Sequence, residues 1–239
     1  MPEDLHLPMR TFLLPGIASD AELLEPQAKR LGPGLVVPPW IEPEGKHEAL
    51  AHYAGRFAEG LELPADGGPY ALGGVSFGGM LSLELARILD PQPACVVLIS
   101  SARSGDAIPR SLWYWEKMAA ILDPWWMKEL SRGIAQPLTW GGGEAAASAE
   151  RFRAMVGRLS PAFFQWSVEA CVSWEGPGPL TEFFPPIAQI HGSDDAVVRC
   201  VPEQCDEVVE GAGHLMNLTH ERTVNRFVFE AVNRRIGRR

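Results

Sequence analysis

Short apolar segments alternate along the chain with stretches in which apolar residues recur every three or four positions. The first pattern predicts buried strands and the second predicts helices. We expect strands at residues 11–14, 35–37, 70–75, 94–100, 187–191 and 206–209. We expect helices at residues 19–31, 47–61, 77–89 and 218–232. This alternation is typical of a mostly parallel sheet flanked by helices, so the predicted fold class is α/β.

The first predicted helix has a local start signal. Ser19 precedes Glu22 by three residues, which is the spacing of a capping box. We therefore expect Ser19 to be the N-cap and the helix to end before Gly32.

The alternation stops between residues 101 and 186, where only helical patterns are found. Three consecutive glycines at 141–143 are typical of a flexible joint between helices. Seven of the eight tryptophans lie between Trp113 and Trp174, so the stretch is unusually aromatic. We predict a core domain formed by residues 1–100 and 187–239, interrupted by a helical lid at 101–186.

Charge and composition exclude several classes of partner. The formal net charge is -9, from 30 acidic and 21 basic residues, which argues against nucleic acid and anionic membranes. The longest strongly apolar run, residues 94–99, is far shorter than the ~20 residues of a membrane-spanning helix. Residues 1–6 lack the features of a signal peptide, so we expect a cytoplasmic protein. In that compartment we expect free thiols at Cys200 and Cys205.

The segment that carries chemistry is Gly73-Gly74-Val75-Ser76-Phe77-Gly78-Gly79, at the junction of a predicted strand and a predicted helix. It contains G-x-S-x-G, in which small residues let neighbouring backbone pass close to a serine on a sharp turn. The helix start adds positive potential beside the serine. The pattern also occurs in structural glycine-rich turns, but its place between strand and helix favours a nucleophile.

A serine hydroxyl needs a base to take its proton, and the base needs a third group to orient it. Asp194 and Asp195 follow the predicted strand at 187–191, and His214 follows the last predicted strand. The chain order serine, aspartate, histidine is that of the α/β-hydrolases. In some of these proteins the carboxylate follows an earlier strand, so a resemblance to them makes Asp106, after the strand at 94–100, an alternative acid.

These motifs together resemble the α/β-hydrolase superfamily, in particular its small serine esterases and thioesterases. The resemblance extends from about Thr11 to the last helix and implies the α/β-hydrolase fold with a catalytic triad. By the H-G-x-x-D match the acid is Asp195 and not Asp194, and by the G-x-G-H match the base is His214. His191 matches a strand-end histidine that is usually structural in the family.

The resemblance also implies an oxyanion hole formed by the backbone N–H groups of Ile17 and Phe77. Where the family commonly has a His-Gly pair, this chain has Pro15-Gly16. The second donor is a backbone group and survives that change, whereas any hydrogen bond of the family histidine does not. The chain begins almost at its first predicted strand, so we expect a reduced sheet without the family's leading antiparallel strands.

The resemblance implies a serine hydrolase that cleaves a carboxylic ester of a small to medium, largely apolar and neutral substrate. The reaction would pass through an acyl-enzyme on Ser76 and needs neither a metal nor an organic cofactor. An acyl-thioesterase or acyltransferase is the alternative, followed by a ligand-binding protein with an idle triad. From the lid we expect Trp113, Trp125 and Trp166 to contact the substrate.

Another segment superficially resembles a zinc-binding helix. His47 and His52 lie five residues apart, whereas H-E-x-x-H needs histidines four apart so that they share one helix face. A solvated helix start is favoured here over a metal site.

Overall fold

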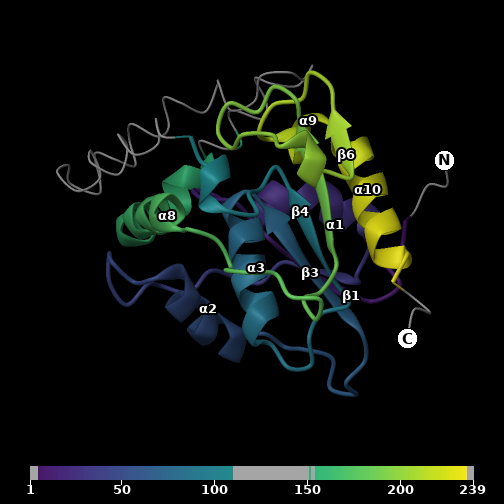
Figure 1. Ribbon diagram of the computed structural model, residues 1–239, viewed down its shortest axis with the longest axis horizontal. Coiled ribbons are helices and arrows are strands. Elements are labelled where there is room, and N and C mark those ends of the chain that lie inside the picture. Colours follow the sequence, from purple (N-terminus) through teal and green to yellow (C-terminus); the bar gives the residue numbers. More distant parts are fainter. Residues whose placement is uncertain (1–4, 110–150, 152–153, 236–239) are drawn as a thin grey trace.

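A computed structural model describes residues 5–109, 151 and 154–235 (Figure 1). Within these residues six strands form one parallel sheet in the order β2-β1-β3-β4-β5-β6. The strands are β1 (Arg10–Leu14), β2 (Leu35–Val36), β3 (Tyr70–Val75), β4 (Cys95–Ile99), β5 (Ile187–Gly192) and β6 (Glu207–Val209). All six predicted strands are present, and the predicted α/β class is confirmed.

Helices cover both faces of this sheet (Figure 1). On one face α1 (Glu25–Leu31) packs against α10 (Glu221–Asn233), and on the other α3 (Phe77–Ile88) packs against α2 (Leu50–Glu59) and α8 (Pro161–Ser173). Each face has its own hydrophobic cluster. Every residue of β3 and β4 is buried, as expected for central parallel strands with a continuous apolar sequence.

The start of the first helix differs from the prediction. The N-cap is Asp20, whose side chain accepts a hydrogen bond from Glu22 N at 3.0 Å, so the prediction of Ser19 was wrong. Ser19 Oγ donates to the carbonyl of Gly16 at 2.8 Å and is not available to cap. The segment is also divided into a 3-10 turn, η1 (Ala21–Leu24), and α1. Pro26, near the start of α1, lacks an N–H and cannot continue the preceding turn as one α-helix.

The last predicted helix is divided as well. His220 has φ -127° and ψ 39°, which is not helical, and it separates α9 (Met216–Thr219) from α10. Two further short turns are η2 (Gly105–Ala107) and η3 (Pro202–Gln204).

The strand order reverses between β1 and β3. The chain leaves β1 for β2 on one side and returns to form β3 on the other side. In open parallel sheets, ligands bind outside the carboxyl ends of the strands at such a reversal. The loop at 15–19 and Ser76 directly follow these two strands.

The division into core and lid stays a prediction. Of the predicted lid, the structure describes residues 101–109, 151 and 154–186, which include α8. Trp113 and Trp125 lie outside the described residues.

Two other expectations concern the environment of the chain. All four cysteines are free, as predicted for Cys200 and Cys205. No helix in the described ranges combines the length and the apolar character needed to cross a lipid bilayer.

The contact between α3 and the loop after β1 depends on Gly78. A Cβ at this position would lie 2.3 Å from the carbonyl oxygens of both Leu14 and Pro15. We therefore expect Gly78→Ala to lower the free energy of unfolding by about 1–3 kcal/mol or more, because backbone has to move. Urea unfolding measures this change.

Gly55→Ala is the matched control, since Gly55 lies within α2 and a Cβ there has no neighbour within 4 Å. This substitution is expected to stabilise the protein by up to about 1 kcal/mol. A Gly78→Ala protein as stable as the wild type would contradict the close packing described here.

Candidate active site

Ser76 lies on a sharp turn between β3 and α3, with φ 53° and ψ -120°. A positive φ is uncommon for a residue other than glycine, and such strain often marks functional sites. The turn is held by hydrogen bonds on both sides of the serine. Ser76 N donates to the carbonyl of Ile99 at 2.9 Å, and the Ser76 carbonyl accepts from Gly79 N at 2.9 Å and Ser101 Oγ at 2.6 Å.

The glycines of the G-x-S-x-G motif permit close backbone contacts around Ser76. A Cβ on Gly74 would lie 2.4 Å from the carbonyl carbon of Gly78. A Cβ on Gly16 would lie 3.5 Å from the Cβ of Ser76, so the loop after β1 passes directly beside the serine.

His214 and Asp195 are joined by a hydrogen bond of 2.8 Å between Nδ1 and Oδ2. The Asp195 side chain is completely buried and that of His214 is 7% exposed. Because a carboxylate only accepts hydrogen bonds, Nδ1 of His214 carries the proton. In the neutral ring this leaves Nε2 as a proton acceptor, which is the state required of a general base.

Four donors surround the Asp195 carboxylate. Val197 N and Val198 N donate to Oδ1 at 2.8 and 3.0 Å, and His191 Nε2 lies 3.0 Å from Oδ2, the oxygen that also binds His214. Burial raises the pKa of Asp195, but the charge of His214 and the hydrogen bonds from both histidines outweigh this. The pKa of Asp195 is therefore held well below its usual value, and the carboxylate stays ionised.

The alternative acids lie in different surroundings. Asp194 is exposed and accepts a hydrogen bond from Ser193 Oγ at 2.9 Å. Asp106 is exposed in η2, and its backbone carbonyl accepts from Arg199. Of the three carboxylates, Asp195 is the one hydrogen-bonded to His214.

Ser76, Asp195 and His214 all follow the carboxyl ends of parallel strands: β3, β5 and β6. Counted as whole residues, Ser76 is 7% exposed and His214 is 6% exposed. No hydrogen bond joins these two side chains within the described residues. Such contacts are often long in resting enzymes and shorten when substrate binds. The role of Ser76 as nucleophile therefore stays a proposal.

The two predicted oxyanion donors are close to the serine in sequence or in the adjoining loop. Phe77 is the first residue of α3, and Ile17 follows Gly16 in the loop beside Ser76. Within the described residues neither N–H has a backbone acceptor. A free N–H at the first position of a helix is expected and suits the binding of an anion.

Trp166 is fully buried and packs its ring against three aromatic side chains. The ring centroids lie 4.1 Å from Tyr53, 5.5 Å from Phe163 and 5.7 Å from Phe77. Its Nε1 donates to the carbonyl of Glu48 at 2.9 Å. Trp166 thus supports the residue that begins α3, and its predicted contact with substrate stays a prediction.

A pocket of about 350 Å³ opens beside the loop after β1. Its apolar lining includes Pro15, Trp40 and Phe163, and its charged lining is Asp20, Glu42 and Arg158. Glu42 Oε2 accepts a hydrogen bond from Ser160 Oγ at 2.9 Å. Arg158 Nε donates to Asp20 Oδ2 at 2.7 Å, so these two charges are paired.

Trp40 was missed by the sequence analysis, which located aromatic pocket residues only in the predicted lid. Its ring lies 6.1 Å from Phe77 and 5.3 Å from Phe163, and its Nε1 donates to the carbonyl of Ser19 at 2.9 Å. The available signal was its place shortly after the predicted strand at 35–37, at the carboxyl edge of the sheet.

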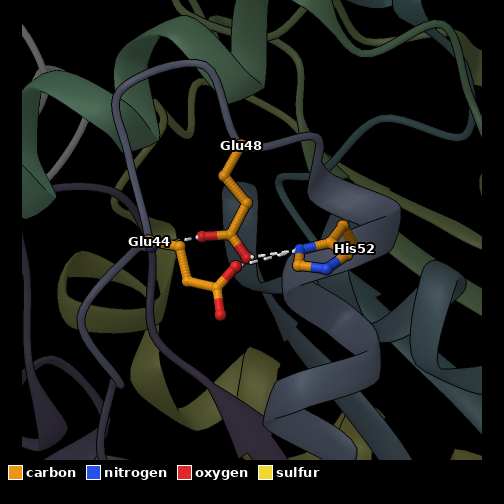
Figure 2. Close-up of side chains that lie close together, drawn as sticks. All are labelled: Glu44, Glu48 and His52. Carbon is orange, nitrogen blue, oxygen red and sulfur yellow. Dashed lines mark hydrogen bonds and ion pairs between the residues drawn. The ribbon is translucent and has the colours of Figure 1, made fainter.

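Figure 2 shows a second group of polar side chains, Glu44, Glu48 and His52, close enough together to suggest a metal site. An ion pair between Arg56 and Glu48 explains this cluster without a metal. Arg56 Nε and Nη2 donate to the two oxygens of Glu48 at 2.9 and 2.8 Å, and Glu44 N donates to the same carboxylate at 2.7 Å. A guanidinium on both carboxylate oxygens opposes cation binding, so the group is an ion-pair network.

Comparisons with known proteins confirm the predicted α/β-hydrolase fold. The model of the alpha/beta hydrolase family matches residues 12–226. An esterase from Thermogutta terrifontis is 17% identical, with a TM-score of 0.78 over 98% of this chain and 92% of its own. An enol-lactonase from Burkholderia xenovorans is 16% identical, with a TM-score of 0.71 over 94% and 92%.

A thioesterase of the prodiginine pathway in Streptomyces coelicolor, RedJ, is 17% identical, with a TM-score of 0.63 over 93% of this chain and 86% of its own. At these identities the likeness is one of fold. A search of curated protein sequences found no significant match.

The lowered pKa of Asp195 predicts a pH dependence of stability. An unfolded aspartate titrates near ~3.9. The ionised Asp195 therefore stabilises the fold above that pH, and this stabilisation is lost as the pH falls toward the lower folded-state pKa. Between about pH 5 and pH 3, the free energy of unfolding should fall less steeply in Asp195→Asn than in the wild type.

Urea unfolding at several pH values measures the slopes. The exposed neighbour provides the control, because Asp194→Asn should keep the wild-type slope. Equal slopes in Asp195→Asn and the wild type would show that the carboxylate is not stabilised as described.

Proposed function

The chain belongs to the alpha/beta hydrolase family, and we propose that it is a serine hydrolase that cleaves carboxylic esters through an acyl-enzyme on Ser76. The observation that carries this proposal is the hydrogen bond between buried Asp195 and His214. The pair lies at the carboxyl edge of the sheet that also bears the strained Ser76 turn.

In the first step His214 Nε2 takes the proton of Ser76 Oγ, and Oγ attacks the ester carbonyl carbon. The carbonyl oxygen becomes an oxyanion, which the N–H groups of Ile17 and Phe77 stabilise together with the start of α3. Asp195 holds His214 with Nε2 toward the serine and stabilises the imidazolium that forms.

Collapse of the tetrahedral intermediate breaks the bond to the alcohol, which receives the proton from His214 Nε2 and leaves. Water then attacks the acyl-enzyme, with His214 accepting its proton. The second collapse releases the acid and returns the proton to Ser76 Oγ. These steps use side chains and backbone N–H groups of the chain alone, so no metal or organic cofactor is required.

The pocket beside the loop after β1 supports a small to medium, largely apolar and neutral substrate. Its volume of about 350 Å³ is at the small end of the usual range for ligand sites. Prolines and aromatic rings form much of the wall, and the charge of Arg158 is paired with Asp20. We propose that this pocket binds the acyl or alcohol group that adjoins the reacting carbonyl. Pro15 in the pocket wall directly precedes Gly16, which lies beside Ser76.

The proposed location is the cytoplasm, where the free thiols of Cys200 and Cys205 would persist.

A thioesterase or acyltransferase activity is the second candidate, and the structural likeness to RedJ supports it. Initial rates on p-nitrophenyl esters of graded chain length, compared with rates on acyl thioesters of matched chains, separate the two. Tight binding of these compounds without turnover would instead indicate a ligand-binding protein.

Ser76→Ala should reduce kcat/KM for p-nitrophenyl esters by at least about a thousandfold, since the substitution removes the attacking oxygen. Ser173→Ala is the matched control, because this exposed serine ends α8 and should leave the rate unchanged. Retention of wild-type activity by Ser76→Ala would exclude the proposed mechanism.

A second variant tests the pocket. Ala21 lines it, and Ala21→Trp should fill part of its volume. We expect KM for a hexanoate ester to rise about tenfold, equivalent to about 1.4 kcal/mol, with little change for the acetate ester. Ala51→Trp places the same side chain on an exposed position of α2 outside the pocket lining and should change neither value. An equal loss for both esters in Ala21→Trp would argue that substrate binds elsewhere.

A further inference from the structure

We propose that Arg103, Gln189 and His191 form a positioning relay that sets the protonation of His191 and thereby fixes the Asp195 carboxylate against His214. The inference rests on the proposed function, because it assigns a purpose to the acid of the triad. The family resemblance implied only a structural role for His191.

His191 is fully buried at the end of β5, and its Nε2 faces two oxygens. These are Oδ2 of Asp195 at 3.0 Å and the backbone carbonyl of Val198 at 3.1 Å. Both oxygens only accept hydrogen bonds, so Nε2 of His191 carries a proton that the two oxygens share.

The other ring nitrogen faces a donor. Gln189 Nε2 lies 3.5 Å from Nδ1 of His191 and donates to the carbonyl of Ser101 at 3.1 Å. An amide nitrogen cannot accept a hydrogen bond, so Nδ1 of His191 faces it with a lone pair. Both sides of the ring thus select the neutral tautomer with its proton on Nε2.

Arg103 determines which way the Gln189 amide points. Its Nε donates to Gln189 Oε1 at 2.7 Å, and its Nη2 donates to the carbonyl of Gln204 at 2.5 Å. Because a guanidinium has donors alone, the amide oxygen has to face Arg103 and the amide nitrogen has to face His191. A flipped amide would place two donors against each other at Arg103.

The relay ends on the oxygen that orients the base. Oδ2 of Asp195 accepts hydrogen bonds from His191 Nε2 and His214 Nδ1, while Oδ1 accepts from two backbone N–H groups. Without the proton of His191, Oδ2 would keep only His214 as a partner, and its position against His214 would be fixed less tightly. The full negative charge would then act on the imidazolium of His214 and favour the protonated base.

Other titratable groups near the relay lie on the segment between β5 and β6. Asp206 Oδ2 accepts from Gln189 N at 2.9 Å. Burial raises the pKa of the Cys200 thiol, and the charge of Asp195 adds to this. Burial and Cys200 raise the pKa of Cys205, which Arg103 opposes. Substitutions of His191 keep all of these groups, so a shifted pH profile reports on His191 itself.

The kinetic test compares His191→Leu with His191→Gln. The glutamine can place a donor nitrogen near the position of Nε2, whereas leucine fills the space without a donor. In His191→Leu we expect kcat/KM to fall about 10–100-fold with little change in KM, a loss comparable to that for the hydrogen-bond partners of metal-binding histidines. The acid limb of the pH profile should move to higher pH, and His191→Gln should recover most of the rate and of the shift. Equal losses in both variants with unshifted acid limbs would overturn the relay.

A measurement without turnover covers the case in which His191→Leu does not fold. In ¹⁵N-labelled Ser76→Ala protein at about pH 8, long-range ¹H–¹⁵N correlation should show His191 as the neutral tautomer protonated at Nε2. Arg103→Met should weaken this preference because the amide of Gln189 is then free to flip. A His191 ring protonated at Nδ1, or at both nitrogens, in the protein that keeps Arg103 would overturn the relay. Since this experiment needs no ester hydrolysis, a failure of the proposed function would leave its result unchanged.

Discussion

The candidate site depends on one buried carboxylate. Moving a charged group out of water costs several kcal/mol unless hydrogen bonds replace the lost solvation. The Asp195 side chain is completely buried, and four donors compensate for its burial. Two come from the backbone that turns after β5, one from β5 itself and one from His214 in the segment after β6. The requirement to solvate one charge therefore determines how the ends of two strands are arranged.

Ser101 connects this charged centre to the serine turn. Its hydroxyl donates to the Ser76 carbonyl at 2.6 Å, and its own carbonyl accepts from Gln189 at 3.1 Å. Gln189 in turn contacts His191, which faces Asp195. A continuous series of hydrogen bonds thus runs from the strained turn to the acid across β4 and β5. Movement of either end would leave buried polar groups without partners, which is costly in a low-dielectric interior.

Features with a local cause could be predicted from the sequence. The central strands have continuous apolar runs, and the serine turn needs glycines at fixed spacing, so β3, β4 and Ser76 were placed correctly. Asp195 was separated from Asp194 by a motif, and the structure places Asp195 in contact with His214. The N-cap of the first helix could not be identified in this way, because serine and aspartate are both favoured at that position and Ser19 and Asp20 are adjacent. The choice depends on the carbonyl of Gly16, which binds the Ser19 hydroxyl.

Features with a distant cause could not be predicted. Arg103 and Gln189 are 86 residues apart in sequence. Their hydrogen bond orients the Gln189 amide, and the proposed role of His191 depends on that orientation. The pocket wall likewise joins Trp40 to Phe163, whose proximity follows from the packing of α8. Periodicity carries no information about such contacts.

The most direct test of the central claim is labelling with a fluorophosphonate, which reacts with serines activated by a histidine base. Peptide mass mapping of the labelled protein locates the modified residue. We expect one label, on the peptide that contains Ser76, and none in Ser76→Ala. Efficient ester hydrolysis by a protein that takes up no label at Ser76, or takes it up at another serine, would contradict it.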